Sequence, residues 1–241
     1  MTAAADERWL EAQRAEAAYW RYARGSQDEF FRITHEKAAA AGFLREHAGD
    51  ALSSLEDGRA FEVGIGPMGF GVISLLPWAS DWTLVGVDPL ALVRPELPPL
   101  AMATWRAAWE LDYAHVQGVG ENAPLASASC DLAVCYNVLA HVSSPAAVLA
   151  ELHRVLKQGG YVLVGEGVRS CAGVLKMKCY TRLAHRGSIL VDAHPHDFTG
   201  PQLETIVRDA GFRIIAADRP HEALLARLLG RCQEQLLVGR K

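Results

Sequence analysis

The sequence predicts a doubly wound α/β fold, in which a mostly parallel sheet carries helices on both faces. Short apolar runs bounded by turn residues alternate with stretches of helical periodicity from residue 59 to residue 165. This alternation is typical of β-α-β units with right-handed crossovers. A chain of 241 residues, of which 50% are hydrophobic and 22% charged, can bury the core of such a domain.

Two helices are expected before the first strand. Residues 3–24 are rich in Ala, Glu and Arg, and Gly25 ends this helix. Ser26 caps a second helix, with Glu29 at the capping-box position, and its apolar stripe continues to His47. Four aromatic residues of the first helix fit either a substrate lid or ordinary packing: Trp9, Tyr19, Trp20 and Tyr22.

Seven short apolar segments bounded by turn residues predict the strands of the sheet. They are residues 59–64, 82–88, 113–117, 130–136, 161–165, 212–217 and 235–238. The helical stretches between them are residues 70–77, 101–110, 145–157, 200–210 and 221–229. The helix from residue 145 has Ser144 at its N-cap and Pro145 at N1, which is typical of a helix start.

Charge and composition exclude several functional classes. Twenty-four basic residues face 28 acidic ones, so the chain lacks the basic excess of a nucleic-acid-binding protein. Its most apolar stretch, residues 131–142, is interrupted by Asn137 and His141 and is shorter than the ~20 residues that span a bilayer. The N-terminal residues lack a basic segment followed by an apolar run, so we expect no secretory signal and a cytoplasmic location.

The strongest motif follows the first strand, where residues 64–69 spell G-x-G-x-x-G. Glycines let the backbone turn sharply and approach a ligand, and Asp88 at the end of the next strand could bind a ribose, as in dinucleotide-binding proteins. However, Glu62 would repel a pyrophosphate, and Pro67 has no N–H to offer a phosphate. S-adenosylmethionine, with an amine at one end and a ribose at the other, fits both carboxylates.

Further segments extend this motif in a characteristic order. They are residues 62–69, 85–88, 120–125, 129–142, 151–160 and 194–212. In this order they resemble the first glycine motif, the ribose-binding acid, the adenine-side loop, the fourth strand, the turn into the fifth strand and the returning segment of class I S-adenosylmethionine-dependent methyltransferases. The resemblance implies a Rossmann-like seven-stranded sheet with an antiparallel last strand, and S-adenosyl-L-methionine as the cofactor.

The resemblance also implies the cofactor-binding residues. They are Glu62, Gly64, Gly66, Asp88, Gly120, Glu121 and Asn137. Val119 stands where many family members place an acid that binds the adenine amino group, so adenine recognition is expected to pass to main-chain groups near Gly120 and Glu121.

Residues 167–198 interrupt the alternation of strands and helices. A segment of this length that leaves the carboxyl end of a strand is a natural substrate cap. We therefore expect one domain over residues 1–241, with N-terminal helices (1–58), a cofactor-binding core (59–166), this cap, and a C-terminal helix and strands (199–241).

His141 and His196 are the candidate catalytic residues. His141 lies beyond the fourth strand, in a loop that borders the methyl group in this family, and a neutral imidazole there could accept a proton from a hydroxyl. We therefore expect methyl transfer to a small-molecule acceptor, with a mild preference for O-methylation. A nicotinamide-dependent reductase and a non-catalytic ligand-binding protein of the same fold stay open as alternatives.

We expect no metal site. The cysteines form no C-x-x-C pair of the kind that metal sites use. Two weaker possibilities are zinc at Cys171, Cys179 and His185, whose spacing matches no common zinc module, and a metal at Asp192, His194, His196 and Asp197.

Overall fold

The protein forms a seven-stranded sheet in a computed structural model that describes residues 3–93, 108, 110–111, 113–183, 194–219 and 232–241. The strands lie in the order β3-β2-β1-β4-β5-β7-β6. They are β1 (Arg59–Val63), β2 (Thr83–Asp88), β3 (Ala114–Gln117), β4 (Cys130–Tyr136), β5 (Leu156–Val168), β6 (Arg213–Asp218) and β7 (Gln233–Arg240). Six strands are parallel and β7 is antiparallel to both neighbours, which confirms the predicted fold class.

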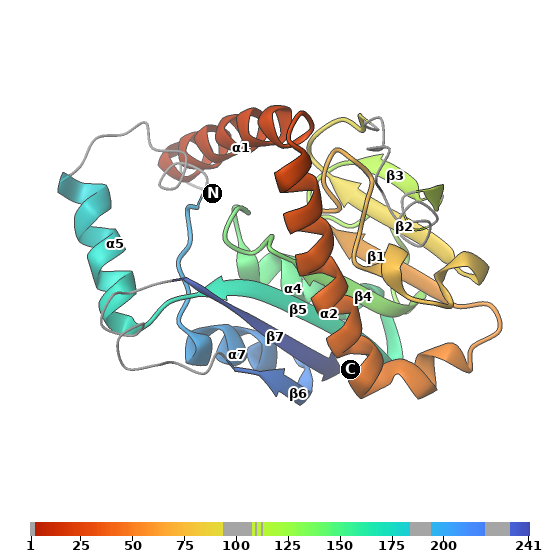
Figure 1. The fold of residues 1–241 in the computed structure, drawn as a ribbon. Coiled ribbons are helices and arrows are strands. Elements are labelled where there is room, and N and C mark those ends of the chain that lie inside the picture. The colour runs from red at the N-terminus through yellow and green to blue at the C-terminus, as the bar shows by residue number, and fades with distance from the viewer. Residues whose placement is uncertain (1–2, 94–107, 109, 112, 184–193, 220–231) are drawn as a thin grey trace.

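Helices cover both faces of the sheet (Figure 1). They are α1 (Ala3–Ala23), α2 (Gln27–Ser53), α4 (Pro145–Val155), α5 (Cys171–Leu183) and α7 (Gly200–Asp209), with short 3-10 turns η1 (Ile73–Leu75) and η2 (Ala79–Asp81). Leu44 and Leu52 of α2 pack with Leu84 on one face. Leu149 of α4 and Leu203 of α7 pack on the other, which divides the apolar core into two layers.

The predicted helix over residues 70–77 is wrong. The structure has only the 3-10 turn η1 there, because five residues separate Gly71 from Pro77 and proline cannot continue a helix. The segment after the glycine motif therefore has no regular helix to support it.

The boundary between α4 and β5 and the structure of the cap also differ from the prediction. Strand β5 begins at Leu156, which pairs with Cys130, so α4 ends at Val155 and the Gly159 turn lies within the strand. The predicted cap contains a helix, α5, which projects from the side of the molecule in Figure 1. The helix predicted over residues 221–229 and most of the one over 101–110 lie outside the described residues.

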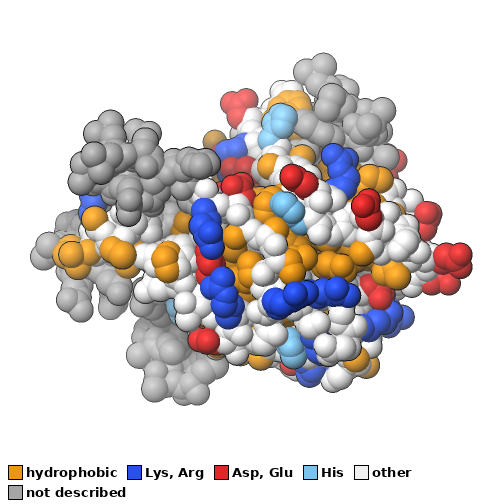
Figure 2. All heavy atoms as spheres, turned by 90° about the horizontal axis from the view of Figure 1, so that it is seen from below, with side chains coloured by type: hydrophobic (Ala, Val, Ile, Leu, Met, Phe, Trp, Pro, Cys, Tyr) orange, Lys and Arg blue, Asp and Glu red, His pale blue; other side chains and the backbone are white. Residues whose placement is uncertain are grey.

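The surface carries charges of both signs. In the view from below, Lys and Arg side chains gather near the middle of the face, and Asp and Glu side chains lie mostly around them (Figure 2). None of the described helices has the length and apolar character needed to cross a lipid bilayer.

Candidate active site

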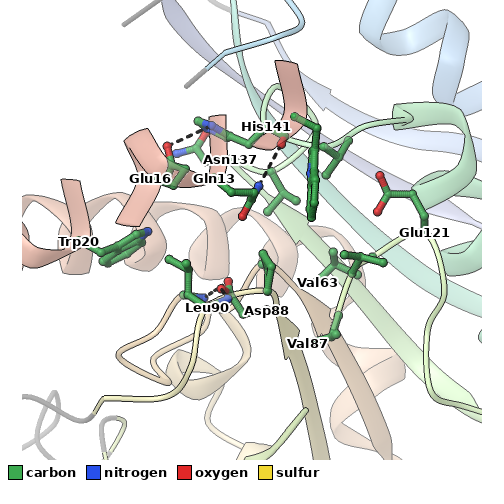
Figure 3. A pocket seen from close by; sticks show the side chains of 18 residues that line it. Gln13, Glu16, Trp20, Val63, Val87, Asp88, Leu90, Glu121, Asn137 and His141 are labelled. Carbon is green, nitrogen blue, oxygen red and sulfur yellow. Dashed lines mark hydrogen bonds and ion pairs between the residues drawn. The ribbon is translucent and has the colours of Figure 1, made fainter. Parts of the chain in front are cut away.

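One cavity lies where β1, β2 and β4 end and α1 crosses the sheet; we call it the glycine-loop cavity (Figure 3). Its lining residues come from strand ends, from the loops after them and from α1. They are Trp9, Gln13, Glu16, Trp20, Val63, Gly64, Gly66, Val87, Asp88, Pro89, Leu90, Val119, Gly120, Glu121, Asn137, Val138, His141 and Val142. Six of the seven residues predicted to bind the cofactor, all except Glu62, thus lie around one cavity, together with His141.

The glycine loop, residues 64–71, forms one wall of this cavity. Gly64 and Gly66 have left-handed backbones, with φ of +70° and +82°. A Cβ atom on Gly64 would lie 2.1 Å from Cγ2 of Val138, and one on Gly66 would lie 3.1 Å from the Trp20 ring. Glycine is therefore required at both positions, for backbone conformation and for space.

Asp88 ends β2 and reaches back to the glycine loop. Its Oδ2 accepts a hydrogen bond of 2.9 Å from the Gly66 N–H, and its Oδ1 accepts one of 2.8 Å from the Leu90 N–H. Burial raises the pKa of this carboxyl above its ordinary value, while the two N–H donors act in the opposite direction. A carboxylate oxygen accepts more than one hydrogen bond, so Asp88 retains capacity for ligand hydroxyls.

Glu62 lies behind the glycine loop and does not line the cavity. Its oxygens accept hydrogen bonds from the N–H groups of Val72 at 2.8 Å and Ile73 at 3.2 Å. The Tyr113 hydroxyl donates a third, at 3.1 Å. The side chain is 1% exposed. The contact of Glu62 with the cofactor stays a prediction, while the structure shows this carboxylate holding the backbone after the glycine loop and the Tyr113 hydroxyl.

Glu121 and Asn137 shape the far side of the cavity. Glu121 Oε1 accepts hydrogen bonds from the Ser143 N–H at 2.9 Å and from the Ser143 hydroxyl at 2.7 Å. This ties the loop after β3 to the start of α4. Asn137 has φ of +54°, and its N–H donates to the Gly165 carbonyl at 2.9 Å. Both residues thus hold loops at the carboxyl end of the sheet, where they line the cavity.

Helix α1 supplies the opposite wall. Trp9, Gln13, Glu16 and Trp20 are spaced by four, three and four residues, so they share one face of the helix. The sequence left open whether the aromatic residues of this helix line a site or only pack on the fold. In the structure, Trp9 and Trp20 line the cavity. Tyr22 is instead 64% exposed.

Glu16 brings a carboxylate to His141. Its Oε1 lies 3.1 Å from Nδ1 of His141, and the two side chains are 19% and 18% exposed. The Gln13 amide donates to the His141 carbonyl at 3.5 Å, which adds a second contact from the same helix (Figure 3). The His194 ring centroid lies 4.4 Å from that of His141.

A second cavity adjoins the first; we call it the histidine cavity. The two share Glu16, Trp20, Gly64, Asn137 and His141. Its other lining residues are Tyr19, Arg32, Ile33, Glu36, Lys37, Tyr136, Ala140, Glu166, Gly167, Arg169, His194, His196, Asp197, Cys232, Gln233 and Glu234. His141 therefore stands at the junction of two spaces.

His196 lines the histidine cavity and ties it together. Its Nε2 lies 3.0 Å from the Val142 carbonyl oxygen, and its N–H donates to the Ala140 carbonyl at 3.2 Å. Because a carbonyl only accepts, Nε2 carries the hydrogen in this contact. His196 thus joins the last part of the cap to the loop after β4.

Sequence reasoning missed three charged residues of the site. Glu16 shares a helix face with Trp9 and Trp20, Lys37 interrupts the apolar stripe of α2, and Glu166 follows a buried strand segment at its carboxyl end. Each is a charged residue among mostly apolar neighbours on its helix face or strand, and this departure was the signal in the sequence that could have found it. Glu166 is 3% exposed and accepts hydrogen bonds from the N–H groups of Ala140 and Gly167.

Within the described residues, no group of three or more His, Cys, Asp or Glu side chains is arranged to hold a metal ion. His185 and Asp192, each part of one weaker metal possibility, lie outside those residues.

Comparison with known proteins identifies the chemistry of the first cavity. Residues 62–164, which include the glycine loop, Asp88 and His141, match the family described as a methyltransferase domain. This match, over 103 of the 241 residues, supports the class I S-adenosylmethionine-dependent methyltransferase that the sequence predicts. The match implies S-adenosylmethionine as the cofactor and favours a methyltransferase over the nicotinamide-dependent reductase. No curated protein sequence matches the chain.

Solved structures show the same fold at low sequence identity. The YcgJ protein of Bacillus subtilis is 16% identical to this chain, with a TM-score of 0.56. The match covers 84% of this chain and 98% of YcgJ. A SAM-dependent methyltransferase structure from Methanosarcina mazei is 19% identical, with a TM-score of 0.51, over 78% and 93% of the two chains. At these identities the likeness establishes the fold alone.

The glycine-loop cavity of the methyltransferase suits its cofactor chemically. Asp88 offers carboxylate oxygens for ribose hydroxyls, and Val63, Val87 and Val119 give apolar walls of the kind that a purine needs. The glycine loop allows close backbone approach on one side, and Trp20 closes the other. The residues present therefore fit S-adenosylmethionine.

Proposed function

We propose that the protein methylates a hydroxyl group of a small-molecule acceptor bound in the histidine cavity, with His141 as general base. The observation that carries this proposal is the contact of 3.1 Å between His141 Nδ1 and Glu16 Oε1 at the junction of the two cavities. A positioned imidazole oriented by a carboxylate is an arrangement suited to proton abstraction.

The direction of the proton follows from this contact. An ionised carboxylate only accepts hydrogen bonds, so Nδ1 of a neutral His141 carries the hydrogen and Nε2 is left with a lone pair. Nε2 would take the hydroxyl proton as the new carbon–oxygen bond forms, and Glu16 would stabilise the resulting imidazolium. The bound cofactor supplies an electrophilic methyl group on its sulfonium sulfur. The chain's contribution is chiefly to hold nucleophile and methyl group in line.

The cofactor contacts are part of the same proposal. Asp88 would bind the ribose, and Gly64 and Gly66 would contact the cofactor through the backbone. Gly120 and Glu121 would lie on the adenine side, and Asn137 near the methionine moiety. Glu62 would hold the glycine loop from behind, through the hydrogen bonds that it accepts from the N–H groups of Val72 and Ile73. Support comes from the grouping of all these residues except Glu62 around the glycine-loop cavity.

The domain organisation supports a small acceptor. We treat residues 1–241 as one catalytic unit, in which α1, α2 and both ends of the cap contribute to the walls of the histidine cavity. Arg169 precedes α5, and His194 follows the cap residues that lie outside the described ranges, and both line this cavity. A space bounded by side chains on several elements suits a small molecule.

The test is transfer of a labelled methyl group to a panel of phenols, alcohols and amines, measured with wild type, H141A and E16Q. Loss of a positioned base costs about a hundredfold to ten-thousandfold, so H141A should lose that much kcat on a hydroxyl acceptor while cofactor affinity changes little. E16Q keeps an oxygen that can accept from Nδ1 but removes the negative charge that would stabilise the imidazolium, so its kcat should fall by less than that of H141A.

The pH profile separates this proposal from its competitors. Wild-type activity should fall as the solution becomes acidic enough to protonate imidazole, and H141A should lack that fall. If H141A keeps a near-normal kcat and still loses activity at acidic pH, another residue is the base. H196A is then the variant to measure. Activity that depends on neither histidine indicates an amine acceptor that is already neutral when bound.

A further inference from the structure

Lys37 is a buried cation at the back of the glycine loop. It lies in α2, in line with the buried residues Ile33, Ala41 and Leu44, and only 7% of it is exposed. A lysine is almost never buried to this extent without partners, because removing an ammonium group from water is costly. Its partners therefore indicate its role.

Those partners are the two carbonyl groups that bracket the glycine turn. The Lys37 ammonium donates to the Ile65 carbonyl at 3.4 Å and, by a shorter hydrogen bond, to the Phe70 carbonyl. It also lies 5.7 Å from the centroid of the Phe70 ring, within the range of a cation–π contact. One side chain thus joins the residue before Gly66 to the residue after Gly69.

The loop needs this support because no regular helix follows it. The expected helix is replaced by the 3-10 turn η1, so the loop is held by individual hydrogen bonds. Asp88 accepts from the Gly66 N–H, and Glu62 accepts from the N–H groups of Val72 and Ile73. These carboxylates hold amide groups, whereas Lys37 holds the carbonyl groups.

The charges around Lys37 explain how a buried ammonium is tolerated. Burial lowers its pKa, while the nearby carboxylates of Glu62, Asp88 and Glu36 favour the charged form. Glu62 and Asp88 are themselves buried, at 1% and 6% exposure. Lys37 therefore offsets part of the negative charge that these two carboxylates place beneath the loop.

We propose that Lys37 is a positioning residue, which fixes the glycine loop in the conformation that binds S-adenosylmethionine. It acts through the backbone of residues 65 and 70. Without it the loop would sample other conformations. The free energy needed to order the loop would then be subtracted from the free energy of cofactor binding, so the affinity would fall. The role concerns cofactor binding and does not depend on the identity of the acceptor.

The test compares K37M and K37R with a control, R45M, which removes a cation from an exposed position on the same helix. Loss of hydrogen bonds from a charged donor corresponds to about a 10- to 150-fold change, so K37M should raise the Kd for S-adenosylhomocysteine by that factor in calorimetry. The KM for S-adenosylmethionine should rise in parallel, with kcat at saturating cofactor near that of wild type. R45M should match wild type in all three constants.

K37R should recover part of the lost affinity, because a guanidinium group can also donate to two carbonyl oxygens. A folded K37M with the wild-type Kd overturns the proposal, and so does a K37M that loses kcat with KM unchanged. If circular dichroism shows that K37M does not fold, K37Q takes its place, because its shorter neutral side chain stays polar but cannot reach both carbonyl oxygens as the ammonium does. A folded K37Q with the wild-type Kd would then overturn the proposal.

Discussion

Replacing Glu62 with Gln tests whether this carboxylate stabilises the fold from behind the glycine loop. The glutamine has nearly the same shape but only one acceptor oxygen, and its NH₂ group would face one of the present donors. Glu62 now accepts from the N–H groups of Val72 and Ile73 and from the Tyr113 hydroxyl. At least one of these buried donors would lose its acceptor in E62Q.

The magnitude follows from the number and kind of these bonds. A buried donor without a partner costs about 1–3 kcal/mol, and the remaining bonds lose the extra strength of a charged acceptor. We therefore expect E62Q to lower the free energy of unfolding by about 2–4 kcal/mol. For a domain of this size that corresponds to a decrease in Tm of roughly 4–16 °C.

Urea unfolding followed by circular dichroism measures this change, with E46Q as the matched control. Glu46 is an exposed glutamate on α2, and its replacement should shift stability by no more than about 0.5 kcal/mol. An E62Q midpoint equal to that of wild type, with an unchanged m-value, would refute the assigned hydrogen bonds.

Three further variants address cofactor affinity, helix stability and acid sensitivity. D88A should raise the Kd for S-adenosylhomocysteine about 10- to 150-fold in calorimetry, and an unchanged Kd in a folded variant would leave this carboxylate a purely structural role. G42A should stabilise the protein by about 0.5–1 kcal/mol, because a Cβ added at this position of α2 meets no atom within 4 Å; a lower Tm contradicts this reasoning. Hydrogen bonds from Arg219 and Arg208 lower the pKa of Glu204 from 4.5 to about 2, so its contribution to stability is complete above pH 4.5 and is lost as pH falls toward 2. Urea midpoints across this pH range should show a smaller loss for E204Q than for wild type.

The strands could be predicted closely because each is a short apolar run between turn residues. The predicted ranges 59–64, 82–88 and 130–136 differ from β1, β2 and β4 by at most one residue at either end. Strand β5 was predicted too short, because Gly159 and Gly160 suggest a turn and only the pairing of Leu156 with Cys130 places them within a strand. That pairing is a tertiary contact, which local sequence does not reveal.

In the site, too, residues marked by local sequence patterns could be predicted, and those that depend on tertiary contacts could not. Asp88 and Asn137 could be located because they follow predicted strands, and the carboxyl ends of parallel strands meet at one edge of the sheet. The contact between Glu16 and His141 could not be predicted, because the sequence of α1 does not reveal which part of the sheet the helix packs against. The sequence predicts that Glu62 faces a ligand, because it does not show where the donors at positions 72, 73 and 113 lie; their placement depends on the path of the chain beyond the loop.

The two kinds of wall around the glycine-loop cavity differ in how they can move. The strand ends belong to a continuous hydrogen-bonded sheet, so displacing one of them would break backbone pairing on both sides. Helix α1 keeps its backbone hydrogen bonds within itself and meets the site through side chains such as Trp20 and Glu16. Displacing α1 would leave the pairing of the sheet intact, but it would separate Trp20 from Gly66 and Glu16 from His141.

The two walls therefore divide the work of the site. The strand ends and their loops supply Gly64, Asp88 and Asn137, whereas α1 supplies Trp20 and Glu16 from a separate element. The contact between Glu16 and His141 thus depends on where α1 packs, so a substitution that shifts this helix would disturb the imidazole without touching the sheet.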